Sequence, residues 1–99
     1  MTQVGTLFLE IIAAKLDIST DTWGKMDPFC IISTQGSTVK TKTHFKADKN
    51  PVWNEKFPIK VIDIKGDIKI EVQEEDTMSN DFVGDTTFKI EKLCAQPSD

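Results

Sequence analysis

The fold of this chain is decided by the segment Asp48-Lys49-Asn50-Pro51-Val52-Trp53-Asn54-Glu55-Lys56-Phe57-Pro58-Ile59-Lys60-Val61. Its first four residues are a turn signal, because Asp and Asn tolerate turn conformations and proline fixes the backbone. Apolar Phe57, Ile59 and Val61 then occupy every second position, which is the period of a half-buried β-strand. Pro58 cannot donate a hydrogen bond to a sheet, so we expect this strand at a sheet edge.

The same period of two recurs on both sides of this segment. Short polar turns such as Gln35-Gly36-Ser37 separate the alternating runs. The expected strands cover residues 7–11, 28–34, 38–46, 57–61, 68–72 and 82–90. The sequence contains neither a convincing helical period nor a repeat. Six strands with turn-rich links predict an all-β fold, an antiparallel Greek-key β-sandwich, in a single domain over residues 1–99.

Composition excludes several classes of protein. The net charge of −4, with lysine as all 12 basic residues, argues against a duplex nucleic-acid binder. The chain has neither an apolar run near the roughly 18–20 residues of a membrane span nor a signal-peptide pattern. Cys30 and Cys94 form no CxxC pair, which favours a reduced, intracellular setting, and Cys30 is expected to be packed. No catalytic constellation is present, so we expect a protein that is not an enzyme.

Two acidic clusters interrupt the strand pattern, at residues 21–29 and 74–81. If both loops lie at the same end of the sandwich, mutual repulsion makes the cluster costly unless a cation fills it. A carboxylate-rich cage suits Ca²⁺ better than zinc or copper. The candidate metal ligands are Asp21, Asp27, Glu74, Asp76 and Asp81. The alternative is that these side chains are solvated turn residues.

Calcium would change the charge of this region strongly. The five carboxylates carry −5, so two calcium ions (+4) would bring the patch to −1 and the chain from −4 to 0. Such a change is a switch for contact with an acidic membrane. Trp23 and Met78 lie near the loop tips and are expected to enter the lipid headgroup region. The alternative for Trp23 is that it folds back onto the sandwich, whereas Trp53 is expected in the core.

A basic stripe is expected on the strand over residues 38–46, because Lys40, Lys42, His44 and Lys46 recur at every second position. Two further lysines lie on the following strand. Near an acidic leaflet each lysine contributes about 1 kcal/mol to membrane binding. Lys40, Lys42 and Lys46 are therefore predicted membrane contacts. We interpret His44 as part of this face and not as a metal ligand. The alternative is a solvated sheet face.

With these motifs in place, the chain resembles the C2 domain, the calcium-dependent phospholipid-binding β-sandwich. The likeness spans about residues 6–90, and its motifs follow the family's order. The segment over residues 50–57 matches the signature NPxWNExF almost letter for letter. The other matching segments are Gly5-Thr6-Leu7-Phe8-Leu9-Glu10-Ile11, Met26-Asp27-Pro28-Phe29, Glu74-Glu75-Asp76 and Asn80-Asp81-Phe82-Val83-Gly84.

The resemblance implies that the five carboxylates bind calcium and that the backbone carbonyls of Thr22 and Glu75 add ligands. The chain departs from the family in its third loop. Glu74 stands where aspartate is usual, and the spacing from Asp76 to Asp81 is one residue shorter than the commonest pattern. An alternative alignment puts Glu75 where Asp76 is expected. Weakening or loss of one ion is the expected consequence, since glutamate moves the carboxylate by a methylene.

The resemblance to the family's type II topology also implies two more strands after Ile90, whereas the sequence ends at Asp99. The last of these strands would lie beside the first strand of the chain. Without it, ladder groups stay unpaired and part of the core is exposed. Either the 99 residues are a fragment, or another chain or an unusual pairing closes the sheet.

Three functions follow as hypotheses. The first is a non-enzymatic calcium-binding module that docks on acidic phospholipid, in the cytoplasm, as a peripheral membrane protein. The second is a calcium-independent protein-interaction module that holds a protein partner or self-associates through the incomplete sheet. The third is the targeting fragment of a larger membrane-associated protein.

Overall fold

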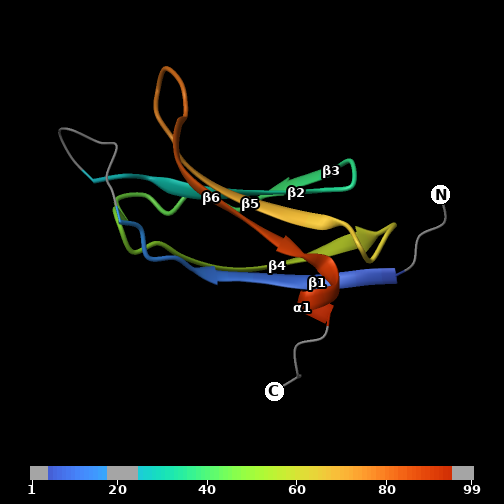
Figure 1. Ribbon diagram of the computed structural model, residues 1–99. Coiled ribbons are helices and arrows are strands. Elements are labelled where there is room, and N and C mark those ends of the chain that lie inside the picture. The colour runs from blue at the N-terminus through green and yellow to red at the C-terminus, as the bar shows by residue number, and fades with distance from the viewer. Residues whose placement is uncertain (1–4, 18–24, 95–99) are drawn as a thin grey trace.

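The computed structural model describes residues 5–17 and 25–94, which form two layers of β-strands (Figure 1). One layer is a four-stranded sheet in the order β3-β2-β5-β6, and the other consists of β1 and β4. The elements are β1 (Gly5–Ala13), β2 (Pro28–Thr34), β3 (Ser37–Lys40), β4 (Val52–Val61), β5 (Asp67–Glu74), β6 (Asp81–Lys89) and α1 (Ile90–Cys94). All strand pairings are antiparallel, so the predicted β-sandwich is confirmed.

The position of β4 agrees with the expectation from Pro58. In the described part of the chain β4 pairs with β1 alone, so its other side is a sheet edge. Pro58 lies opposite Phe8 in this pairing. The strand begins at Val52, earlier than the predicted start at Phe57, because the pairing with β1 continues as far as Ala13.

The hydrophobic core lies between the two layers. Ile32 of β2 and Ile68 of β5 are almost fully buried and contribute to it from the four-stranded sheet. Trp53 of β4 contributes from the other layer and is 9% exposed. Its Nε1 donates a hydrogen bond to the carbonyl oxygen of Pro28 at 3.2 Å, so the side chain bridges the two layers. The predicted core position of this tryptophan is confirmed.

Cys30 lies in the middle of the core side of β2 and is buried. Burial, and after it the negative charge of Glu55, raises the pKa of the Cys30 thiol to about 12. The backbone N–H of Cys30 donates to Oγ1 of Thr41, and the N–H of Thr41 donates to the carbonyl of Cys30, both at 2.9 Å. The expectation of a packed thiol is therefore confirmed.

The predicted strand over residues 38–46 is wrong beyond the end of β3. Past that point the pairing with β2 is irregular. Thr41 and His44 still donate to the backbone carbonyls of Cys30 and Pro28, but Lys42 N–H between them donates to Oε2 of Glu55 at 2.8 Å. Lys46 has φ 62°, a left-handed conformation that a strand does not accommodate. Residues 41–51 therefore form a hydrogen-bonded connection, called the 41–51 loop below. Alternation of lysines in this sequence does not place them on one sheet face.

The end of the predicted sixth strand is also different. Ile90 begins the short helix α1, which the sequence did not predict. Its side chain is fully buried, and its N–H donates to the carbonyl of Gly66 at 3.0 Å. Leu93 of the same helix packs against the core. The apolar pattern at this end of β6 thus reflects burial at a helix start and not a continued strand.

Candidate functional site at the acidic end of the sandwich

Strand register brings the two acidic clusters to one end of the four-stranded sheet. Pro28 of β2 lies opposite Glu74 of β5, and Glu74 lies opposite Asp81 of β6. Asp27 directly precedes Pro28, so it belongs to the same row. Since paired strands are about 4.8 Å apart, carboxylates from three neighbouring strand ends share one edge of the molecule. The condition that both clusters lie at the same end of the sandwich is therefore met for these three residues.

A backbone hydrogen bond joins the two clusters directly. The N–H of Glu75 donates to the carbonyl of Asp27 at 2.9 Å. This bond extends the pairing of β2 and β5 by one step beyond the strand ends. It fixes the position of the acidic cluster at residues 21–29 relative to the cluster at residues 74–81.

The carboxylate of Asp27 is held in place by the 41–51 loop. Its Oδ1 accepts a hydrogen bond from the backbone N–H of Lys46 at 2.6 Å. Asp48 fastens the same loop, because its Oδ1 accepts from the N–H of Met26 at 3.2 Å and its own N–H donates to the Met26 carbonyl at 2.9 Å. Asp27 therefore has a fixed orientation at this end of the sandwich.

The two glutamates of the third loop differ in environment. The Glu74 side chain is buried, with the residue 5% exposed, at the end of β5. Glu75 is exposed, and its Oε1 accepts a hydrogen bond from Oγ1 of Thr43 at 2.7 Å. In the alternative alignment Glu75 would use its carboxylate for calcium, and it would then have to share that carboxylate with Thr43. The contact thus favours the alignment in which Glu75 contributes its backbone carbonyl.

Asp76 and Asp81 border the loop that connects β5 and β6. Oδ1 of Asp76 accepts from the backbone N–H of Thr77 at 2.6 Å and from its Oγ1 at 3.1 Å. The N–H of Asp76 donates to Oδ1 of Asn80 at 3.4 Å, which closes the loop on itself. Asp81 is half-buried as the first residue of β6. These bonds leave Asp76 pointing into its own loop.

The complete ligand set stays a prediction. Asp21, Thr22 and Trp23 lie outside the described residues. Within residues 5–17 and 25–94, no three Asp, Glu, His or Cys side chains are grouped closely enough to hold a metal ion. The donors at this end are all oxygen atoms, which is the chemistry that a hard cation such as Ca²⁺ requires. The residues therefore fit calcium by type.

Apolar side chains project from the same end. Met78 is 92% exposed at the tip of the loop between β5 and β6, which extends beyond both layers (Figure 1). Phe82 is 57% exposed and directly follows Asp81. Sequence reasoning selected Met78 but missed Phe82, because strand alternation does not tell which face of an edge strand is covered.

The lysines selected from the sequence are exposed, but they occupy two kinds of structure. Lys40 ends β3 and lies over the ring of Phe29, with its Nζ 5.8 Å from the ring centroid. Lys42 and Lys46 lie in the 41–51 loop. The two lysines on the next predicted strand lie in β4, which belongs to the other sheet, so a basic stripe along one sheet face is wrong.

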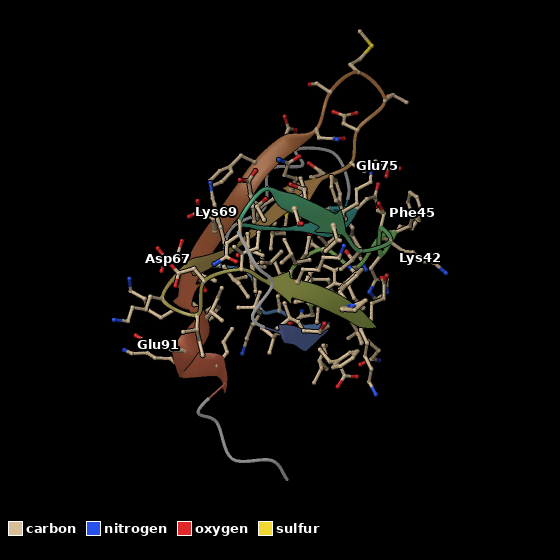
Figure 2. All side chains as sticks on the ribbon, turned by 90° about the vertical axis from the view of Figure 1, so that its right-hand side faces the viewer. Lys42, Phe45, Asp67, Lys69, Glu75 and Glu91 are labelled. Carbon is tan, nitrogen blue, oxygen red and sulfur yellow. The ribbon has the colours of Figure 1, made fainter. Side chains whose placement is uncertain are left out.

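A shallow pocket of about 590 Å³ lies beside the acidic end, and Lys40 and Lys42 line one part of it. Glu75 and the exposed ring of Phe45 also line it. Figure 2 shows Lys42, Phe45 and Glu75 on the same side of the molecule. Basic, aromatic and acidic side chains are thus neighbours in this pocket. The sequence pattern had placed them on separate elements. His44 is tied to the start of β4, since its Nδ1 accepts from the N–H of Val52 at 2.9 Å.

Comparison with known proteins agrees with this architecture. "Multiple C2 domain and transmembrane region protein 8" of Arabidopsis thaliana is 33% identical over 88% of this chain, and the match covers 9% of that protein. Synaptotagmin-5 of the same plant is 37% identical over 81% of this chain and is covered to 15%. The chain therefore spans only a small part of the curated relatives it matches. Within the described residues, no helix has the length and apolar character needed to cross a membrane.

Solved structures show the same fold. A C2 domain of plant extended synaptotagmin 1 superposes with a TM-score of 0.85 at 23% identity, over 93% of this chain and 73% of that one. The calcium-bound pair of C2 domains of extended synaptotagmin 2 gives 0.82 at 25% identity, over 93% and 36%. The family model of the C2 domain matches residues 5–99. The chain belongs to the C2 domain family.

Proposed function

We propose that this chain is a non-enzymatic calcium-binding module that docks on acidic phospholipid membranes through its acidic end. The observation that carries the proposal is the strand register at this end. It aligns Asp27, Glu74 and Asp81 on neighbouring strands, and the bond from Glu75 N–H to the Asp27 carbonyl holds the two loops together. Like charges in such a row are costly unless a cation is bound.

The side chains that would hold calcium are those selected from the sequence. They are Asp21, Asp27, Glu74, Asp76 and Asp81, with the backbone carbonyls of Thr22 and Glu75. Bound calcium would neutralise these loops and bridge them to lipid phosphate. The Asp27 carboxylate is oriented by the hydrogen bond from Lys46 N–H, which lowers the cost of binding a cation. Asp76 must exchange its bonds to Thr77 for metal coordination, so we expect it to contribute less affinity than Asp27.

Membrane contact would come from apolar and basic groups around the acidic loops. Met78 and Phe82 are exposed there, and Trp23 is the third candidate from the sequence. Burial of such a side chain is worth roughly 1.5–3 kcal/mol, and each of Lys40, Lys42 and Lys46 adds about 1 kcal/mol near an anionic surface. The sum suits reversible attachment, so we propose a cytoplasmic protein with peripheral membrane association.

Sedimentation with phosphatidylserine vesicles tests this proposal. We expect the chain to pellet with vesicles in calcium and to be released by chelator. Asp27→Asn should abolish the pelleting, whereas Asp63→Asn should not. Asp63 is a matched control, because it lies in the turn at the opposite end and an asparagine there can still accept from Lys65 N–H. Equal pelleting in calcium and chelator would refute the calcium switch.

A calcium-independent protein-interaction module is the second candidate. It is favoured by one observation, the apolar groove that the two-stranded layer leaves open. A targeting fragment of a larger protein is the third, since the match covers only 9% of the first relative. Salt separates membrane docking from an apolar protein interface, because screening weakens only the former.

A further inference from the structure

Phe45 is an aromatic side chain that the 41–51 loop holds in solvent at the acidic end. Its exposed fraction is 62%, and Figure 2 shows it pointing away from the body of the molecule. Figure 1 shows the 41–51 loop at the same end of the sandwich as the loop between β5 and β6. Phe45 also lines the shallow pocket that Glu75 and Asn80 line. The ring therefore lies beside the proposed calcium site and outside the core.

A tight turn sets the position of this ring. The N–H of Ala47 donates to the carbonyl of His44 at 3.3 Å, which closes a turn with Phe45 and Lys46 at its corner. Lys46 has φ 62° and Phe45 has no positive φ, as is typical of a type II turn. Both sides of the corner are bonded, because His44 N–H donates to a backbone carbonyl of β2 at 2.9 Å and Lys46 N–H donates to the Asp27 carboxylate at 2.6 Å. The turn therefore holds Phe45 away from the sandwich.

The residues around Phe45 are mainly basic. The 41–51 loop contains Lys42, Lys46 and Lys49, all of them exposed, and a single carboxylate, that of Asp48. With histidine neutral, the formal charge of the loop is +2 (3 − 1), whereas the whole chain carries −4. An aromatic ring among lysines is complementary to the surface of an acidic bilayer, because the ring can enter the headgroup region while the lysines contact lipid charges.

We infer that Phe45 is a second apolar anchor of this chain on acidic phospholipid, separate from the loop between β5 and β6. The anchor presupposes the calcium-dependent docking proposed above. The loop that carries Met78 extends from one side of the acidic end and Phe45 projects from the other, so the proposed calcium site lies between two contacts with the bilayer (Figures 1 and 2). Two separate contacts fix the tilt of the domain on the membrane, whereas a single contact leaves the tilt free.

The two anchors differ in how firmly the protein holds them. Met78 lies on a loop whose bonds run mainly within the loop, as from Asp76 N–H to Asn80 at 3.4 Å. Phe45 lies in a turn that is bonded to β2 and to Asp27. A side chain on a rigid turn loses less conformational freedom on binding. We therefore expect Phe45 to contribute about as much to vesicle affinity as Met78, although its exposed fraction is smaller.

Phe45→Ser and Phe8→Ser are a matched pair of tests. Phe8 is 76% exposed in β1, five positions before Ala13, which places it roughly 16 Å along the strand from the 41–51 loop. Both rings are exposed, so neither serine should unfold the chain. On phosphatidylserine vesicles in calcium, Phe45→Ser should weaken binding about tenfold, because one apolar side chain no longer enters the lipid. Phe8→Ser should leave the affinity unchanged.

Tryptophan at the same two positions gives an independent measurement. With brominated lipid in the vesicles and calcium present, the fluorescence that Phe45→Trp adds to the wild type should be quenched, and that of Phe8→Trp should not. An unchanged affinity of Phe45→Ser, or equal weakening by both serine variants, would overturn the anchor. If the wild type still binds in calcium and is released by chelator, either result leaves the proposed docking standing. A wild type that does not bind vesicles would overturn both.

Discussion

The two sides of the acidic end are built differently. On one side the 41–51 loop bonds to residues far away in the sequence, through Lys46 to Asp27 and through Asp48 to Met26. On the other side the loop after β5 bonds mainly to itself, and Met78 at its tip is 92% exposed. The 41–51 loop thus fixes the backbone and the Asp27 carboxylate at this end. The loop after β5 makes few contacts with the rest of the sandwich. Substitutions should cost stability on the first side and only binding on the second.

The largest effect on stability is expected at Trp53, a core residue that bonds to the Pro28 carbonyl next to Asp27. Trp53→Ala should lower the free energy of unfolding by about 3–5 kcal/mol, because it empties a large core site. Trp53→Phe keeps most of the volume and loses the bond to the Pro28 carbonyl, worth about 1 kcal/mol. Urea denaturation measures both. Equal losses would mean that the hydrogen bond, and not packing, supports this side.

A smaller effect is expected at Asp48 in the 41–51 loop. Asp48→Ala removes the acceptor of Met26 N–H and puts alanine at φ 55°, so we expect a loss of about 1–3 kcal/mol. Asp48→Asn is the control, since asparagine keeps an acceptor and tolerates the left-handed conformation. Thermal and urea unfolding should rank the variants in that order. A loss in Asn as large as in Ala would contradict the hydrogen-bond explanation.

Met78 should show the opposite behaviour. Met78→Ser should change the free energy of unfolding by less than about 0.5 kcal/mol, because the side chain is exposed. Vesicle affinity in calcium should nevertheless fall about tenfold, from the lost burial of one apolar side chain in lipid. Ile64→Ser, an exposed apolar residue in the turn at the opposite end, serves as the control. Equal vesicle affinities of the two variants would show that Met78 does not contact the membrane.

The smallest effect at neutral pH concerns Cys30, which lies behind the 41–51 loop. Its pKa is about 12 in the folded chain against an ordinary value of 9.0, so folding favours the protonated thiol. The corresponding stability is complete below pH 9 and is lost as the pH rises from 9 toward 12. Cys30→Ala should lack this alkaline decrease. Chemical labelling of the Cys30 thiol at neutral pH should be slow. It should become faster in Asp48→Ala if the 41–51 loop opens in that variant.

Much of this fold was predictable because strands with one buried face carry a period of two. That signal located six strands, and Pro58 identified a sheet edge. The core position of Trp53 was expected from the motif at residues 50–53 and not from the period of two. The period of two failed at residues 41–46, where lysines recur at every second position as in a strand, although side-chain acceptors such as Glu55 interrupt the backbone pairing with β2. Such contacts are distant in sequence, so local periodicity does not reveal them.

The candidate site was predictable in its residue types and not in its geometry. Carboxylates beside turns identified Asp27, Glu74 and Asp81, and the register confirmed that their strand ends adjoin. The hydrogen bond that orients Asp27 comes from a backbone N–H, at Lys46, which any residue type could supply. Exposure of Phe82 depends on which strands face it, and that is a property of the whole sandwich.

The pairing of β1 with β4 has a consequence for how the chain reaches this structure. Gly5 lies opposite Val61, so the first strand cannot be paired until more than half of the chain has been synthesised. The β2–β3 and β5–β6 pairs are each closed by a short connection and can form early. Long loops between paired strands slow their formation because of the entropy of closure. We therefore expect the four-stranded sheet to nucleate folding, and β1 to be an unpaired, aggregation-prone segment until the final step.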